Sequence, residues 1–282
     1  MEFAQIYKPL TATPFWEGES YREYEPCEAL KPYIRCFWGS RHPYITGENK
    51  GTGRVVIPDT CMDIIFNVNF TENRIDSGFC GINDSSFVAE GKGEKCCEVS
   101  TFAIRFYAWS AILFSEESMK HVKNGFFEAG EYFSYVKREI QPFLFDITSI
   151  EKQIPLVEAV LLRHLDLERE NRILTDCMGQ MLKCGGNMKM GVLAKEVHIG
   201  TRQIERVFKE NIGLTPKAFA SLIRYQSVWR EALFQKGFSV QDAVCEFGYT
   251  DQAHLLHEFK KYHGSTLREA VRLARQNVGF LQ

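Results

Sequence analysis

Two short stretches, 51 residues apart, carry side chains with the donors and acceptors needed to contact nucleic-acid bases. In the first stretch, Arg202, Glu205 and Arg206 are spaced to share one face of a helix. Arginine can donate two hydrogen bonds to guanine O6 and N7, and glutamate can accept one from cytosine N4. The matching positions of the second stretch are Gln252, Ala253 and His257. These six residues are our candidates for contacts with base edges.

Polar and cationic side chains around those six could bind phosphate. Lys209, Lys260 and Lys261 follow on the same two predicted helices, Thr201 begins the first helix, and His254 lies in the first turn of the second. Phosphate contacts position a protein on nucleic acid without reading its sequence. We therefore expect these five residues to add affinity.

Each stretch is the second helix of a helix-turn-helix pattern. In the first pattern, the turn at 198–200 precedes a helix over 201–210. In the second, a turn at Gly248 precedes a helix capped by Thr250 that ends near 262, with Asp251 in its first turn. The positions expected to face inward recur at helical spacing and are apolar: Val192, Leu193, Ala194, Val197, Ile204, Val207, Phe208, Val240, Ala243, Val244, Phe247, Leu255, Phe259 and Tyr262.

The two patterns are copies of one unit. Phe208-Lys209 and Gly213-x-Thr215 recur at an offset of 51 as Phe259-Lys260 and Gly264-x-Thr266. Such an internal repeat indicates two copies of a supersecondary unit. Between them, Pro216 begins a helix that runs to about Gln235, before Lys236-Gly237.

Residues 171–275 resemble the DNA-binding domain of the AraC/XylS family of bacterial transcription regulators. The residues that carry the resemblance are Leu193-Ala194, Gln203-Ile204-Glu205-Arg206-Val207-Phe208, Gly213-Leu214-Thr215-Pro216, Phe247-Gly248-Tyr249, Asp251-Gln252-x-His254-Leu255 and Phe259-Lys260. His198 and Gly200 replace the family's usual turn glycine and capping serine, which predicts a looser first turn. The resemblance implies double-stranded DNA as a partner, contacted in two successive major grooves about 34 Å apart.

The length and charge distribution indicate more than one domain. A chain of 282 residues is long for a single core. From 171 to 282 it holds 16 Lys and Arg against 10 Asp and Glu, a net of +6, whereas the remainder has a net of −8. A basic module beside an acidic one suits a phosphate-binding domain with a separate regulatory domain. We expect limits of 1–148 for the regulatory domain, 149–170 for a connecting helix and 171–282 for the DNA-binding domain.

The N-terminal part has the pattern of short strands separated by turns. Residues 30–38 are expected to form a short element that enters a strand. The further strand candidates are 54–59, 62–68, 74–80, 86–90 and 100–107, which suggest a small barrel or sandwich. A short helix is expected within 126–140. The predicted fold class is α+β, with a barrel-like β-rich regulatory domain followed by an all-α domain with two helix-turn-helix units.

Residues 20–165 also resemble the sensor-like, cupin-like domain of one AraC subfamily. The matching residues are Leu30-x-Pro32-Tyr33-Ile34-x-x-Phe37-Trp38-Gly39, Ile57-Pro58-Asp59-x-Cys61-x-Asp63-Ile64-Ile65-Phe66-Asn67 and Ile104-Arg105-Phe106. The resemblance implies an unidentified small effector, and it favours a homodimer. The amphipathic helix expected over 149–169 could mediate that dimer or could simply cover the strands. RNA polymerase is a further candidate partner.

The strands carry a candidate ligand pocket. Its members are Trp38, Asp63, Phe66, Arg105, Tyr107 and Trp109. An apolar cavity with a few polar groups is the usual small-molecule site, although core packing explains the aromatic residues as well. Arg105 is the most informative, because an inward-facing strand arginine needs an anionic partner.

The remaining motifs argue against an enzyme. No nucleophile elbow, zinc-protease helix or phosphate-binding glycine loop occurs, and nothing predicts a cofactor. The cysteines form no metal-ligand spacing, so we expect no metal site. The adjacent Cys96-Cys97 pair could bind a soft metal but suits an ordinary loop, whereas Cys177, Cys184 and Cys245 are expected in the core. A DNA-directed thiol enzyme, a metal or redox sensor and a DNA-binding protein with a vestigial sensor remain the alternatives.

The N-terminus lacks the pattern of a secretion signal, and no apolar run reaches membrane-spanning length. We therefore expect a cytoplasmic protein with reduced thiols and no membrane partner.

Overall fold

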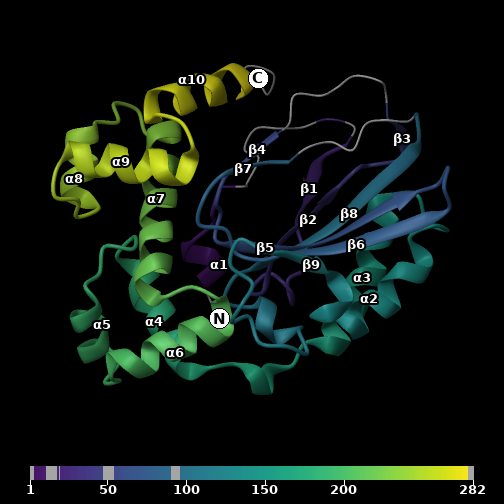
Figure 1. Cartoon of the computed structure of the whole chain (residues 1–282), viewed down its shortest axis with the longest axis horizontal. Helices are drawn as coiled ribbons and strands as arrows, with labels where there is room; N and C mark the ends of the chain where they lie inside the picture. Colours follow the sequence, from purple (N-terminus) through teal and green to yellow (C-terminus); the bar gives the residue numbers. More distant parts are fainter. Residues whose placement is uncertain (1–2, 11–17, 19, 47–53, 90–95, 279–282) are drawn as a thin grey trace.

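The computed structural model describes residues 3–10, 18, 20–46, 54–89 and 96–278. A strand-rich N-terminal region precedes a helical C-terminal region, and the two pack side by side (Figure 1). This order confirms the predicted α+β class. The domain limits proposed at 148 and 170 stay predictions, because buried apolar side chains form one continuous core through both regions.

The strands form a main antiparallel sheet with the order β1-β2-β8-β5-β6-β9, and β3 pairs with β8. A separate pair contains β4 and β7. Among the described residues β1 and β9 do not pair, so the main sheet is open. The strands are β1 Arg22–Tyr24, β2 Ile34–Gly39, β3 Tyr44–Ile45, β4 Arg54–Val56, β5 Cys61–Asn69, β6 Arg74–Cys80, β7 Phe87–Ala89, β8 Glu98–Tyr107 and β9 Phe126–Glu128.

The two faces of the central strands have different roles. Successive side chains on a strand point to opposite faces. On β5, Met62, Ile64 and Phe66 point to one face and are fully buried. Asp63 points to the other face, where it is in register with Arg105 of β8. The sheet therefore has one apolar face and a second face with buried charge.

Of two helix predictions for the segment after β8, one is confirmed and one needs correction. The short helix expected within 126–140 is α2, Ser134–Ile140, which follows β9 and a 3-10 turn, η2 (Ala129–Glu131). The helix expected over 149–169 is α3, Ile150–His164. It ends early because the side chain of Asp166 accepts the backbone N–H of Glu168 and starts the separate turn η4, Leu167–Arg169. A further 3-10 turn, η3 (Gln141–Phe143), follows α2, and η1 (Ala111–Leu113) follows β8.

The strand prediction for 86–90 corresponds to β7, and Glu90 lies outside the described residues. The short helix α1, Phe3–Ile6, packs against the helical region, and the ring of Phe3 meets Trp109 edge-on at 5.8 Å. Among the helices of the described residues, none has the length and apolarity needed to span a bilayer.

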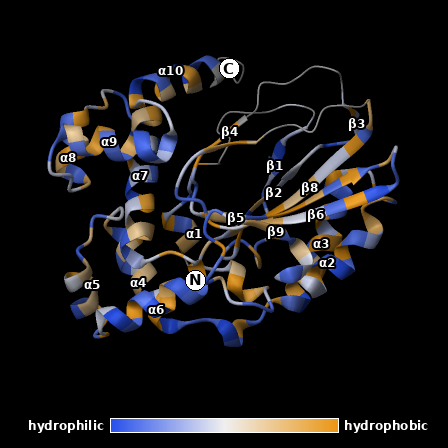
Figure 2. Ribbon diagram, in the orientation of Figure 1, coloured by the Kyte–Doolittle hydropathy of each residue, from blue (hydrophilic) through white to orange (hydrophobic). Residues whose placement is uncertain are grey.

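The helical region contains α4 Arg172–Lys183, α5 Met190–Glu196, α6 Thr201–Ile212, α7 Pro216–Phe234, α8 Val240–Glu246, α9 Gln252–His263 and α10 Leu267–Val278. Helices α6 and α9 end in the same way, at Gly213 (φ 83°) and Gly264 (φ 80°). Only glycine adopts this left-handed conformation without strain, which explains the glycine in both copies of the repeat. Pro216 begins α7 after Thr215, whose hydroxyl caps the helix by accepting the N–H of Ala218. Figure 2 shows hydrophilic and hydrophobic residues alternating along these helices, as expected of helices with one buried face.

Candidate DNA interface

The first helix-turn-helix unit consists of α5 and α6. Ile204, Val207 and Phe208 of α6 are buried, as their spacing predicts. Leu193 is the fully buried member of the α5 face, whereas Val192 is 47% exposed, contrary to the predicted inward position. In the turn, His198 has a φ of 54°, a left-handed conformation that costs a non-glycine residue energy. The turn therefore retains the backbone shape that a glycine would favour.

The outer face of α6 carries the first set of predicted readers. Arg202, Glu205, Arg206 and Lys209 are all exposed, as is Thr201 at the first position of the helix. Within the described part of the chain, neither Arg202 nor Arg206 takes part in an ion pair. Their guanidinium groups are therefore available to an external acceptor.

The second unit consists of α8 and α9, with Gly248 (φ 65°) in the turn. Asp251 caps α9 by accepting the N–H of His254 at 2.7 Å, so the predicted cap, Thr250, lies one residue too early. The ring of His254 packs edge-on against Tyr249 at 5.3 Å. His254 thus contacts the turn, which leaves its phosphate role a prediction.

The outer face of α9 is less polar than that of α6. Gln252, Ala253, His257, Lys260 and Lys261 are exposed, and Leu256 is 41% exposed among them. The amide Nε2 of Gln252 donates to Oε1 of Gln241 on α8 at 2.7 Å. The structure therefore brings the six base-reading candidates onto two exposed helix faces, three on each helix.

A half-buried ion pair fixes α9 to α7, the helix between the units. Arg224 donates from Nη2 to both carboxylate oxygens of Glu258, at 2.8 and 2.9 Å, and lies 4.1 Å from the ring centre of Tyr249. The hydroxyl of Tyr249 also donates to Glu258 at 2.9 Å. Sequence reasoning missed this network, because the 34 residues between Arg224 and Glu258 leave no local signal.

The predicted ligand residues do not line one cavity. Three of them meet: Nε of Arg105 donates to Asp63 at 2.9 Å, and the indole N–H of Trp38 donates to the same oxygen at 2.6 Å. Asp59 and Glu23 lie 3.6 and 3.7 Å from the Arg105 guanidinium. We call Glu23, Asp59, Asp63 and Arg105 the charge cluster. Arg105 therefore finds the anionic partners it needs within the protein.

The other three predicted ligand residues are part of the core. Phe66 points to the sheet face opposite Asp63, because the two are an odd number of positions apart. Tyr107 and Trp109 stack at 4.6 Å with both rings buried.

Within the charge cluster, burial raises the pKa of Asp59 to about 6, although Arg105 opposes this effect. The charge cluster thus holds a carboxyl group whose pKa is raised by its burial.

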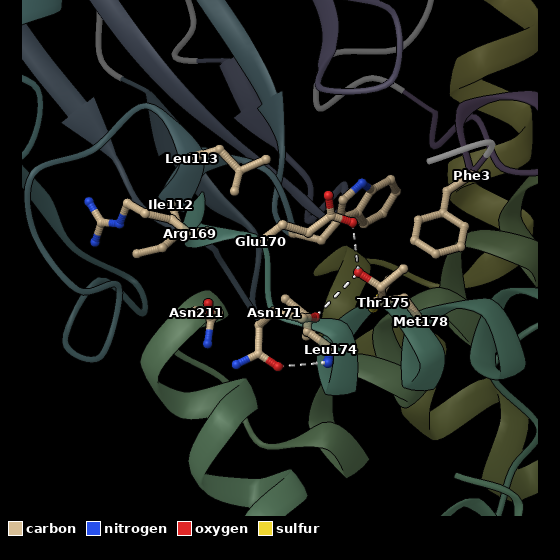
Figure 3. Close-up of a pocket in the computed structure, with 11 residues that line it drawn as sticks. Phe3, Ile112, Leu113, Arg169, Glu170, Asn171, Leu174, Thr175, Met178 and Asn211 are labelled. Atoms are coloured by element: carbon tan, nitrogen blue, oxygen red, sulfur yellow. Dashed lines mark hydrogen bonds between the residues drawn. The ribbon is translucent and has the colours of Figure 1, made fainter. Parts of the chain in front are cut away.

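Two cavities lie elsewhere. An open groove of about 680 Å³ is lined by Gly18, Tyr21, Arg22, Arg41, His42, Pro43, Tyr44 and Ile45. A second cavity, of only about 10 Å³, lies between the two regions and is lined by residues that include Phe3, Trp109, Thr175 and Asn211 (Figure 3). That volume has room for about one water molecule, so the second cavity is too small for an effector.

Four of the cysteines have the surroundings of unreactive thiols. Burial raises the pKa of Cys36 and Cys61, that of Cys80 to about 12 and that of Cys177 to about 11. Cys96 and Cys245 are exposed, so the core position expected for Cys245 is wrong. In the described ranges, no three His, Cys, Asp or Glu side chains gather as metal ligands.

Comparison with known proteins agrees with this architecture. Residues 193–272 match the family described as a helix-turn-helix domain, and residues 22–128 match a domain of unknown function (DUF6597). No curated protein matches the chain.

Similar solved structures include an AraC-type transcriptional regulator from Chromobacterium violaceum, with 21% identity over 37% of this chain and 93% of that one and a TM-score of 0.34. ToxT from Vibrio cholerae O395 has 8% identity over 83% and 96%, with a TM-score of 0.41. ToxT from Vibrio cholerae strain SCE256, with an unsaturated fatty acid bound, has 9% identity over 82% and 93%, with a TM-score of 0.39. Residues 193–272, which contain both repeated units, therefore belong to the family described as a helix-turn-helix domain.

Proposed function

We propose that α6 and α9 enter two successive major grooves on one face of a DNA duplex. Arg202, Glu205 and Arg206 read bases from the first helix, and Gln252, Ala253 and His257 read them from the second. Thr201, Lys209, His254, Lys260 and Lys261 bind phosphate. The observation that supports this most directly is that both helices expose the same positions of the repeat, including the pair Lys209 and Lys260.

The rigidity of α7 supports the same proposal. Its 19 residues run without interruption between the two units, which lie toward opposite ends of this helix in Figure 1. Phe219, Leu222 and Ile223 are buried along it. A single packed helix limits the separations that the recognition helices can adopt, so a fixed spacing between two DNA elements is expected.

The experiment selects binding sites from random duplex DNA with the full chain, then compares wild type with Arg206→Ala. Loss of a bidentate contact to guanine should weaken binding about 10- to 100-fold and relax the preference at one position. Arg138→Ala is the control, because Arg138 is equally cationic and exposed on α2 of the N-terminal region. Equal affinity of Arg206→Ala and wild type at every salt concentration would remove α6 as a reader.

We further propose that the N-terminal region binds a small effector in the open groove beside β1 and β3. Arg22 offers positive charge there, Arg41 adds a guanidinium that also pairs with Glu151 at 3.1 Å, and the rings of Tyr21 and Tyr44 line the groove. Together they favour an anionic ligand with an apolar body. A panel of carboxylates and phosphate esters, screened by thermal shift, tests this. Arg22→Ala should abolish any shift, and Arg74→Ala on β6 should not.

We also propose that the chain forms a homodimer through α3. Leu156 and Leu162 are 42% and 45% exposed on this helix, while Val157 and Leu161 on its other side are buried. Leu156→Glu combined with Leu162→Glu should shift the sedimentation coefficient from dimer to monomer. The matched control is Leu167→Glu, which is also exposed but lies on η4, and no shift with the double variant would exclude this surface. Contact with RNA polymerase is proposed from the family alone.

A further inference from the structure

Two loops of the N-terminal region contact the helical region at equivalent positions of its repeat. The first loop, 81–86, joins β6 to β7, and the second, 118–125, precedes β9. Each loop meets the last turn of one recognition helix. Neither contact involves the N-terminal halves of α6 and α9, where the base-reading residues lie.

The first contact is at the end of α9. The backbone N–H of Ser86 donates to the carbonyl of Tyr262 at 3.1 Å. The approach is close, since a Cβ atom on Gly264 would lie 2.5 Å from the hydroxyl of Ser86. Gly264 therefore serves both as the helix cap and as the site where the loop approaches.

The second contact is at the end of α6. The backbone N–H of Met119 and the hydroxyl of Ser118 both donate to the carbonyl of Glu210, at 2.9 and 3.1 Å. A Cβ atom on Gly213 would lie 2.6 Å from the carbonyl oxygen of Met119. Gly213 and Gly264 occupy the same position of the 51-residue repeat, so both loops approach the same glycine of the repeat, while the accepting carbonyls of Glu210 and Tyr262 differ by one position.

The two loops are bonded to each other. The side chain of Asn124 donates to Asp84 at 2.8 Å and accepts the backbone N–H of Asp84 at 2.9 Å. Lys123 adds an ion pair with Asp84 at 2.6 Å. Asn124 has a φ of 52°, a conformation that asparagine tolerates better than most residues. The loops are thus joined into one body.

We propose that loops 81–86 and 118–125 form a clamp that ties the C-terminal ends of both recognition helices to the N-terminal region and so fixes their relative placement. The inference rests on the proposed DNA-reading role of α6 and α9. The joined loops contact one point on each helix-turn-helix unit, so they resist rotation of one unit relative to the other. Any change in the N-terminal region that opens the clamp would alter the spacing of DNA elements that the protein accepts.

The first test measures amide exchange, resolved to single residues, in the full chain without DNA. Asn124→Gly removes both bonds that the Asn124 side chain makes to Asp84, leaves the Lys123–Asp84 ion pair in place, and retains a residue that tolerates positive φ. The amides of Ser86 and Met119 should both exchange about tenfold faster or more, while that of Ile64 in the central sheet is unchanged. Asn73→Gly is the matched control, because Asn73 has a φ of 51° in the exposed β5–β6 turn. Faster exchange at only one of the two amides, or at neither, would overturn the clamp.

The second test uses duplexes carrying the two DNA elements selected by wild type, with one or two base pairs inserted between them. Wild type should lose at least about tenfold in affinity on insertion, and Asn124→Gly should lose much less. An identical loss in both proteins would overturn control of spacing by the clamp. If wild type selects no DNA, the proposed DNA contacts fail, and the exchange measurement still decides whether the clamp exists.

Discussion

Gln226 of α7 donates a hydrogen bond of 2.6 Å from its side-chain amide to the carbonyl of Pro58, at the start of the central strand β5. The oxygen of the same amide, Oε1, accepts a hydrogen bond of 2.9 Å from the backbone N–H of Leu10. Gln226 is 2% exposed and Pro58 is also buried, so the Pro58 carbonyl depends on this bond, whereas Leu10 is half-buried. Pro58 precedes Asp59 of the charge cluster. One side chain therefore connects the helix between the DNA-binding units to the buried charges of the N-terminal region.

Gln226→Leu should lower the free energy of unfolding by about 1–3 kcal/mol, because the Pro58 carbonyl would stay buried without a partner and the bond to the Leu10 N–H would be lost. Chemical denaturation measures this loss. Gln235→Leu, at the exposed end of the same helix, should change stability by less than about 0.5 kcal/mol. Equal midpoints for Gln226→Leu and wild type would show that the two bonds do not stabilise the contact.

Removing the cation of the charge cluster should be more damaging. Arg105→Met leaves Asp59 and Asp63 buried near each other without a positive partner, and the expected loss is about 3–5 kcal/mol. Adding Asp63→Asn should recover part of this loss, since one unpaired charge is removed. Thermal unfolding at pH 7 provides the comparison, with Arg74→Met on the exposed part of β6 as control. A stable Arg105→Met protein would contradict the role assigned to the cluster.

His263 predicts a pH dependence. Burial lowers the pKa of this imidazole to about 4, from 6.5. The ring stacks on Phe259 at 4.8 Å and its Nδ1 lies 2.9 Å from the Tyr225 hydroxyl. Between these two pKa values the unfolded chain binds a proton that the folded chain excludes, so stability falls as the pH drops from 6.5 toward 4.

The measurement compares wild type with His263→Asn, which keeps an acceptor for Tyr225. From pH 7 to pH 5, wild type should lose roughly 2 kcal/mol more than the variant. The comparison is needed because the raised pKa of Asp59, about 6, acts in the opposite direction: the folded state retains that proton, so its contribution falls as the pH rises. Parallel pH profiles would show that His263 is not buried as a neutral ring.

Lys260 should act on all DNA sequences alike. Lys260→Ala removes one phosphate contact, so the slope of log affinity against log salt should become shallower by about 1 without a change in base preference. Binding assays over a series of salt concentrations test this, with Lys236→Ala in the exposed loop before α8 as control. A changed base preference would instead place Lys260 at a base edge.

Local patterns in the sequence were sufficient to locate both helix-turn-helix units. The apolar positions of α6 and α9 and the glycine at each helix end depend on neighbours within a few residues, and the offset of 51 shows the same local pattern twice. The need of Arg105 for an anion also followed from residue type and strand position alone. The two-residue period of a strand also places Phe66 on the face opposite Asp63. The predicted pocket, which included both residues, did not take this alternation into account.

Only the tertiary structure decided which surfaces meet. Gln226 and Pro58 are separated by 168 residues, and Ser118 and Glu210 by 92. Hydrogen bonds between such distant positions leave no periodic signal, because each partner satisfies its own local pattern equally well without the other. The clamp, the position of the charge cluster and the docking of α7 therefore arise from how the two regions pack, and the sequence by itself determined the DNA-binding units that they hold.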